Sequence, residues 1–148
     1  MAPRFFGKYE HSLDIKGRVI LPARFRNDFM PRAFLSQHED RCLALWTEEE
    51  FDKQLAEHEA LQGQGQSELN RARVWASGST EVEIDKQGRM AIPPSLRQFA
   101  RLDPESLVMV TGAINRVELW NPVVWARRVQ SAEAQIARDP DDEIDTAS

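Results

Sequence analysis

The chain has 148 residues, a length that suits one compact domain or two small repeats that share a core. Apolar residues make up 41% and charged residues 29%, as in ordinary globular proteins, and no run approaches the roughly 18 apolar residues of a membrane helix. No apolar segment follows Met1, and the single cysteine, Cys42, has no internal disulfide partner. We therefore expect a cytoplasmic protein without signal peptide or membrane segment, with Cys42 buried in a strand.

The net charge of −5 is unevenly distributed along the chain. Residues 139–148 contain five acidic residues and no basic ones, residues 39–68 contain nine acidic and two basic, and residues 1–32 contain seven basic and three acidic. A basic segment set apart from the acids is typical of a module that turns one face toward phosphates, but chance clustering on a solvated surface explains the pattern equally well. The acidic tail, 139–148, is expected to be disordered.

The first 31 residues predict a β-hairpin and then a short helix. Apolar and polar side chains alternate along residues 5–13, residues 14–17 have turn chemistry, and residues 18–21 return as the second arm. Pro22 suits a helix start, because it donates no backbone hydrogen bond. The helix is expected to bury two phenylalanines and to turn two arginines outward: Phe25 and Phe29, and Arg24 and Arg26.

Residues 33–79 predict a second hairpin and two helices. The hairpin arms are residues 33–36 and 41–46, and Thr47 caps a helix that runs to about Leu61. This helix is expected to bury Phe51 and Leu55. Residues 67–76 favour another helix, with a strand at their end as the alternative.

The second half of the chain predicts the same order of elements. The expected elements are a strand at 81–84, a turn at 85–89, a return strand at 90–92, a helix from Pro93, hairpin arms at 107–110 and 116–120, and a helix capped by Asn121 with Pro122 behind it. The side chains expected to face inward from these helices are Leu96, Phe99, Ala100, Trp125 and Val129.

This agreement reflects an internal repeat. Copy 1 (residues 14–26) and copy 2 (residues 85–97) share five residue types at equal spacing: Asp14 and Asp85, Gly17 and Gly88, Arg18 and Arg89, Pro22 and Pro93, and Arg26 and Arg97. We divide the chain accordingly into repeat 1 (8–53), a helical linker (54–78), repeat 2 (79–122), a C-terminal helix (123–138) and the tail (139–148).

A catalytic function is not supported by the sequence. The three histidines lack metal-ligand spacing, one cysteine rules out the common zinc patterns, and no phosphate-binding glycine loop is present. Asp14 and Asp85 could be imagined as an acid–base pair, but each stands at the head of a turn, where its carboxylate accepts backbone N–H bonds. We therefore expect no enzyme, no cofactor, no metal and no small-molecule substrate.

A DNA-binding function fits the residues of copy 1 better. A two-stranded hairpin enters the major groove, and Arg18 just past the turn can donate two hydrogen bonds to guanine. Lys16, with Lys8, Arg24 and Arg26, would neutralise phosphates, and Gly17 would let the backbone approach DNA closely. Arg18 and Arg89 could instead form salt bridges with the aspartates of their own turns. The same arginine can form such a bridge and also contact DNA.

The turns of the two copies are not identical in sequence. Gln87 stands where copy 1 has Lys16, so copy 1 is the expected principal reader. The four tryptophans could stack on bases, but their positions at strand ends and on apolar helix faces favour core packing.

The two Asp-x-x-Gly-Arg-apolar-Pro segments, each followed by a hairpin that ends in Trp and by a capped helix, resemble the MraZ family of bacterial regulators, built from two SpoVT-AbrB repeats. The most specific matches are residues 13–18 with Pro22, residues 83–89, and residues 118–122 with Trp125. The resemblance implies an α+β fold with a mainly β core: a pseudo-dimeric swapped-hairpin barrel of two internal repeats, with flanking helices.

The same resemblance implies ring-shaped homo-oligomers that associate with the nucleoid. They would repress transcription through short direct DNA repeats upstream of the division and cell-wall gene cluster, including their own gene. It also implies DNA contact by Asp14, Arg18, Asp85 and Arg89. With the basic and turn residues added, the candidate DNA-binding set is Lys8, Asp14, Lys16, Gly17, Arg18, Arg24, Arg26, Asp85, Lys86, Gly88 and Arg89.

Two rival functions are a ring-forming scaffold for protein partners and an antitoxin-like module that inhibits a toxin. The salt dependence of binding separates them from a DNA-binding protein, because release of counterions from phosphates gives a steep loss of affinity with salt.

Overall fold

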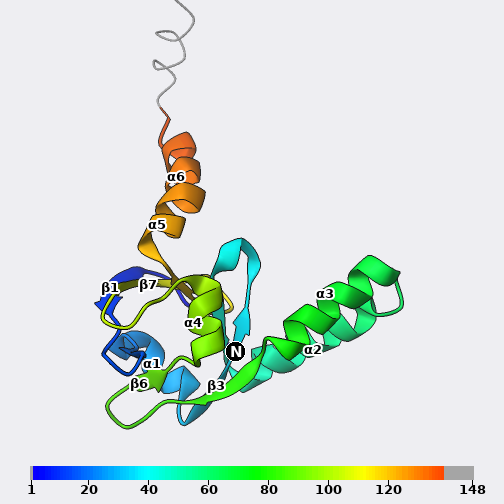
Figure 1. The fold of residues 1–148 in the computed structure, drawn as a ribbon, viewed down its shortest axis with the longest axis horizontal. Coiled ribbons are helices and arrows are strands. Elements are labelled where there is room, and N and C mark those ends of the chain that lie inside the picture. Colours follow the sequence, from blue (N-terminus) through cyan, green and yellow to red (C-terminus); the bar gives the residue numbers. More distant parts are fainter. Residues whose placement is uncertain (1, 139–148) are drawn as a thin grey trace, which may run out of the picture.

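Two antiparallel sheets form the centre of the protein, which the computed structural model describes over residues 2–138 (Figure 1). One sheet has the strand order β1-β7-β8-β4-β3-β5, and β2 and β6 form the other. The strands are β1 (Lys8–Ser12), β2 (Arg18–Ile20), β3 (Arg32–Gln37), β4 (Leu43–Trp46), β5 (Thr80–Glu83), β6 (Arg89–Ala91), β7 (Leu107–Gly112) and β8 (Val117–Trp120). The fold is therefore α+β with a mainly β core, as predicted.

The helices flank this β core. They are α1 (Ala23–Phe29), α2 (Glu48–Leu61), α3 (Gln66–Ser77), α4 (Pro94–Ala100), α5 (Pro122–Trp125) and α6 (Ser131–Ile136), with a 3₁₀ turn η1 (Glu39–Arg41) and a π-helical segment η2 (Ala126–Gln130). No helix within residues 2–138 is long and apolar enough to cross a bilayer.

The two repeats exchange their first strands. β1 of repeat 1 pairs with β7 of repeat 2, β5 of repeat 2 pairs with β3 of repeat 1, and β4 meets β8 at the centre of the sheet. Interchanging the repeats therefore leaves the strand order unchanged, which is the arrangement of a pseudo-dimer with swapped strands.

The predicted β1–β2 hairpin is wrong in its pairing. β1 pairs with β7 and β2 with β6, because the turn between them passes the chain from one sheet to the other. The backbone N–H of Asp14 donates to the carbonyl of Arg18 across this turn, and pairing between the two arms ends there. The predicted hairpins β3–β4 and β7–β8 are confirmed.

The central strands β4 and β8 are buried on both faces. Leu43 and Leu45 of β4 lie in the main core, which both repeats build, whereas Ala44 and Trp46 pack beneath the helices α2 and α3. Trp120 of β8 packs in the same way against Cys42 and α5. Cys42 is buried as predicted, although β4 begins one residue after it.

The helices α2 and α3 form a hairpin that projects from the body (Figure 1). Thr47 caps α2 as predicted, since its hydroxyl accepts a hydrogen bond from the Glu50 N–H. Trp75 stacks on Phe51 from α3, which confirms the helix rather than the strand there. The predicted burial of Leu55 is wrong: its side chain is 42% exposed, because Phe51 and Trp75 fill the contact between the helices.

The second projection is the helical run α5-η2-α6 (Figure 1). The Asn121 carboxamide oxygen accepts hydrogen bonds from the N–H groups of Val123 and Val124, which confirms the predicted cap. The half-buried Trp125 meets the buried Trp120 edge to face at 5.4 Å, and Trp46 and Trp75 are also buried. The predictions for the tail fall on residues 139–148, outside the described part of the chain.

Candidate nucleic-acid interface

The Asp–Arg element of copy 1 is a closed turn. One carboxylate oxygen of Asp14 accepts hydrogen bonds from the N–H groups of Lys16 (2.9 Å) and Arg18 (2.8 Å). Its other oxygen accepts from Arg18 Nε at 2.7 Å. The Asp–Arg bridge uses only Nε, so the two terminal amino groups of the guanidinium stay available for another partner.

The element of copy 2 has the same geometry. Asp85 accepts from the N–H groups of Gln87 and Arg89 at 2.9 Å each, and from Arg89 Nε at 2.8 Å. In both turns the backbone hydrogen bond of the arginine is the largest cause that lowers the pKa of the aspartate, and the guanidinium adds to it. Both aspartates are therefore ionised at neutral pH and hold their arginines in place.

The strands that follow the turns pair with each other. In this β2–β6 ribbon, Arg18 lies opposite Ala91 and Ile20 lies opposite Arg89. The central pair, Val19 and Met90, points into the core and is fully buried. The alternate residues therefore share the opposite, outward face of the ribbon: Arg18, Ile20, Arg89 and Ala91.

This face differs from the predicted one in how it is built. We expected each hairpin to bring its own arginine to DNA, but one ribbon carries both, because β2 and β6 come from different repeats. Two members of the face were missed, namely Ile20, which is 47% exposed, and Ala91. Both residues were predictable from the sequence. Alternate residues of a strand share a face, so the residues two positions after Arg18 and Arg89 lie on the same face as these arginines.

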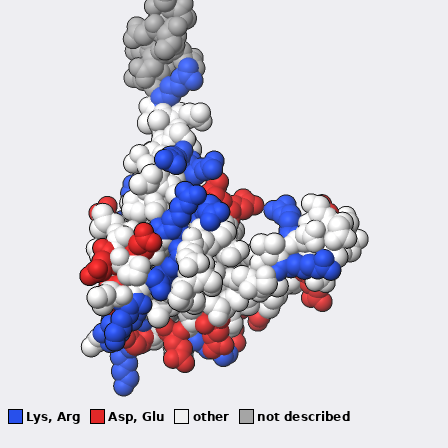
Figure 2. Space-filling model, viewed as in Figure 1, with Lys and Arg blue, Asp and Glu red and all other residues white. Residues whose placement is uncertain are grey.

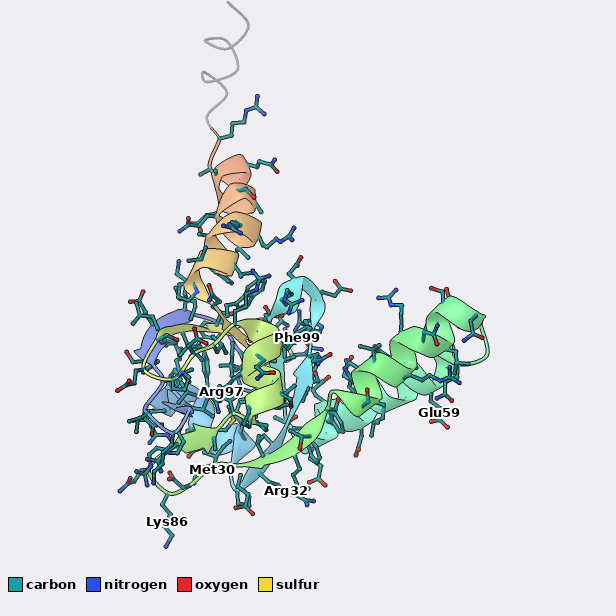
Figure 3. All side chains as sticks on the ribbon, viewed as in Figure 1. Met30, Arg32, Glu59, Lys86, Arg97 and Phe99 are labelled. Carbon is teal, nitrogen blue, oxygen red and sulfur yellow. The ribbon has the colours of Figure 1, made fainter. Side chains whose placement is uncertain are left out.

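Lysines stand at the tips of the turns. Lys16 and Lys86 are both exposed, and Figure 3 shows Lys86 extending away from the body. Figure 2 shows Lys and Arg side chains gathered at this end of the molecule, with acidic side chains beside them. Glu81 and Glu83 line a groove of about 690 Å³ together with Arg18 and Arg89.

The other predicted phosphate ligands lie away from the turns. Lys8 is exposed at the opposite end of β1, with its Nζ 5.9 Å from the ring centre of Trp125. Arg24 is also exposed and is held beside β1, where it donates to the Tyr9 hydroxyl (3.0 Å) and lies over the Phe6 ring. These two residues could extend a contact along β1 but do not share the ribbon face.

Arg26 does not turn outward as predicted. Its Nη2 donates to the Leu21 carbonyl at 3.0 Å, its Nε is buried, and its guanidinium covers Gly88. Arg97, which the candidate set omitted, covers Gly17 in the same way. The close approach that the structure shows at the two turn glycines is that of an arginine from the other repeat. Both glycines have positive φ (75° and 81°), which suits a residue without Cβ.

The described residues contain no group of three or more His, Cys, Asp and Glu side chains that could hold a metal ion. Burial raises the pKa of the Cys42 thiol, so the thiol stays protonated and inert. Burial is also the main cause that lowers the pKa of His38, which lies beside Arg116 and Glu118. We therefore assign no catalytic role to Cys42 or His38.

Comparison with known proteins identifies the family of this chain. The family described as "MraZ protein, putative antitoxin-like" matches residues 5–71 and 75–146. A protein of Halothermothrix orenii named "Transcriptional regulator MraZ" is 37% identical over 129 residues, which are 87% of this chain and 89% of the relative. A protein of the same name from Desulforamulus reducens is 35% identical over 141 residues, 95% of this chain and 98% of the relative. Because the match covers both repeats, the chain belongs to the MraZ family.

Proposed function

We propose that this protein is a transcriptional regulator that binds double-stranded DNA sequence-specifically as a repressor. The observation that carries the proposal is the outward face of the β2–β6 ribbon, where two aspartates hold two arginines in place. The names of the relatives, "Transcriptional regulator MraZ", support the same function.

The ribbon has the dimensions of a major-groove reader. Strand residues rise about 3.4 Å and neighbouring strands lie about 4.8 Å apart, so the Cα atoms of Arg18 and Arg89 should be roughly 8 Å apart. That separation corresponds to two or three base-pair steps of about 3.4 Å. Each arginine can donate its terminal amino groups to guanine O6 and N7, while Ile20, opposite Arg89, offers an apolar contact to a thymine methyl.

The two ends of the β2–β6 ribbon should contribute unequally to the contact with DNA phosphates. Each tip carries one exposed lysine, Lys16 or Lys86, but the strand before the turn of copy 2 has the exposed Glu83 where β1 has Ser12. Anionic phosphates are attracted to both lysines, and the Glu83 carboxylate beside the second turn repels them there. We therefore assign most of the phosphate contact to Lys16, with Lys86 as a second cation at the other tip.

The targets and the assembly are part of the proposal. Following the family resemblance, we propose that the protein acts on short direct repeats upstream of the division and cell-wall gene cluster, including its own gene, as a ring-shaped homo-oligomer on the nucleoid. A ring that presents several ribbons to regularly spaced repeats would add weak contacts through avidity. Native mass measurement of the purified protein, with and without its upstream DNA, tests this assembly.

The test of DNA reading is a mobility-shift titration with the protein's own upstream DNA. Arg18→Ala should cost roughly 1–3 kcal/mol in specific binding, the range of one good bidentate base contact, and should relax sequence preference. Arg18→Ala combined with Arg89→Ala should leave only salt-sensitive, non-specific binding. Full binding of the cognate sequence by the double variant would exclude this mechanism.

Lys16→Ala is the matched control for charge. If Lys16 contacts phosphate, Lys16→Ala should weaken binding to all sequences about equally and lower the slope of log K against log salt by roughly 1. A change in the preferred sequence would make Lys16 a base reader instead. A wild-type protein whose binding to the upstream DNA shows no salt dependence would favour the protein-binding rivals over a DNA regulator.

A further inference from the structure

Two arginines that carry the same position in the two copies reach across the repeats. Arg26 comes from α1 of repeat 1 and covers Gly88 in the turn of repeat 2. Arg97 comes from α4 of repeat 2 and covers Gly17 in the turn of repeat 1. Figure 3 shows Arg97 on α4, close to the body of the molecule and away from the exposed end that Lys86 marks.

Each arginine closes a chain of hydrogen bonds that starts at the glycine it covers. The Gly17 carbonyl accepts from the Ile92 N–H (3.1 Å), and the Ile92 carbonyl accepts from Arg97 Nε (3.0 Å). On the other side the Gly88 carbonyl accepts from the Leu21 N–H (2.9 Å), and the Leu21 carbonyl accepts from Arg26 Nη2 (3.0 Å). Each turn is thus bonded to the strand end of the other repeat and capped by that repeat's arginine.

The arginines pack so closely on Gly17 and Gly88 that neither position has room for a side chain. A Cβ at Gly17 would lie 2.6 Å from Arg97 Nε, and a Cβ at Gly88 would collide with the Arg26 guanidinium. Both glycines are buried despite their place in exposed turns. The Arg97 guanidinium therefore covers the turn of repeat 1, and the Arg26 guanidinium covers the turn of repeat 2.

We propose that Arg26 and Arg97 are positioning residues, each of which holds the DNA-reading turn of the opposite repeat. They contact neither base nor phosphate in this role; they make the two turns one rigid unit, so that Arg18 and Arg89 meet the groove with their spacing already set. The link to DNA rests on the proposed function, but the contact between repeats does not. A preorganised pair loses less conformational freedom on binding, which raises affinity without a new contact.

The position of Arg26 argues against a phosphate contact. Its Nε is buried, and one terminal amino group is occupied by the Leu21 carbonyl. Arg24, two residues earlier on the same helix, is exposed and donates to a surface tyrosine. This neighbour provides a matched control with the same charge.

The first experiment follows amide hydrogen exchange without DNA in Arg26→Lys, Arg97→Lys and Arg24→Lys. Lysine keeps the charge but lacks the planar fork that covers the glycine and reaches the carbonyl. Arg26→Lys should speed the exchange of the Leu21, Gly88 and Arg89 amides, which report on the turn of repeat 2. Arg97→Lys should speed that of Ile92, Gly17 and Arg18 instead, and Arg24→Lys should change neither set.

The second experiment measures binding of the same variants to the upstream DNA over a range of salt. Arg26→Lys and Arg97→Lys should each lower specific affinity about tenfold, equal to ~1.4 kcal/mol, with the salt slope unchanged. A phosphate contact would instead survive in the lysine variant, and its loss in Arg26→Ala would lower the slope by roughly 1.

The outcomes separate this inference from the proposed function. Unchanged exchange in the opposite turn, or faster exchange in the turn of the same repeat, would overturn the cross-repeat hold. Full specific affinity in both lysine variants would overturn the positioning role. Failure of the wild-type protein to bind its upstream DNA would overturn the proposed function and, with it, the positioning role, whereas the exchange pattern would still decide the contact between repeats.

Discussion

Asp14 and Asp85 each use one carboxylate to fix both the backbone of a turn and the side chain of its arginine. Short polar side chains that bond their own backbone a few residues on are a local feature, so the sequence alone was sufficient to predict these turns. The place of Arg26 was not predictable in this way. Its neighbour Gly88 is remote in the sequence, and an arginine among basic residues is indistinguishable from a surface cation until the repeats are placed together.

The aspartates make a prediction about pH. Their pKa values are lowered in the folded protein from the usual 3.8, so both turns contribute stability above about pH 3.8, and this contribution is lost as the pH falls through the lowered values. The free energy of unfolding, measured by urea titration between pH 6 and pH 2, should therefore fall more steeply in the wild type than in a variant with Asp14→Asn and Asp85→Asn. Equal slopes below pH 4 would show that the carboxylates do not stabilise the turns.

At the scale of the elements, local patterns predicted most strands and helices but not their partners. The apolar four-residue run at β4 indicated a buried strand, and the position of Trp46 at its end favoured core packing. The partner of β1 could not be predicted from pairing rules, because a strand normally pairs with its neighbour in sequence, and β1 instead pairs with β7. The exposure of Leu55 was missed for a similar reason: which residues of α2 are covered depends on where α3 places Trp75.

The cap of the C-terminal helix gives a prediction at this scale. Asn121 satisfies two N–H groups of α5 and also donates from its amide nitrogen to the Arg101 carbonyl at 2.8 Å, which ties the helix to the end of α4. Asn121→Ala should therefore lower the free energy of unfolding by about 0.5–2 kcal/mol, the range for loss of a cap. Asn70→Ala on the exposed surface of α3 is the control and should stay within about 0.5 kcal/mol. Equal effects of the two changes would contradict the assigned cap.

At the scale of the whole molecule, the pseudo-two-fold arrangement makes each repeat depend on the other. The main core draws side chains from both repeats, and each repeat supplies an edge strand to the other's half of the sheet. The duplication could be predicted from the matching spacing of copies 1 and 2. The exchange of strands came only from the family resemblance, since the spacing is equally compatible with two separate hairpin domains.

This interdependence predicts how the halves behave when separated. A fragment of residues 1–78 should not fold as a monomer, because β1 would lack β7 and β3 would lack β5. Circular dichroism and sedimentation should show an unfolded or self-associated fragment, and mixing it with residues 79–148 should restore the native spectrum. A monomeric, cooperatively unfolding 1–78 fragment would contradict the exchange.

The exchanged first strand also has a consequence for synthesis on the ribosome. β1 is among the first elements to emerge, yet the residues that pair with it, Leu107–Gly112, are made only near the end of the chain. Until then β1 has no native partner, and an unpaired strand edge invites contact with other chains. The ribosome must therefore synthesise residues 13–106 before this pair of the final sheet can form.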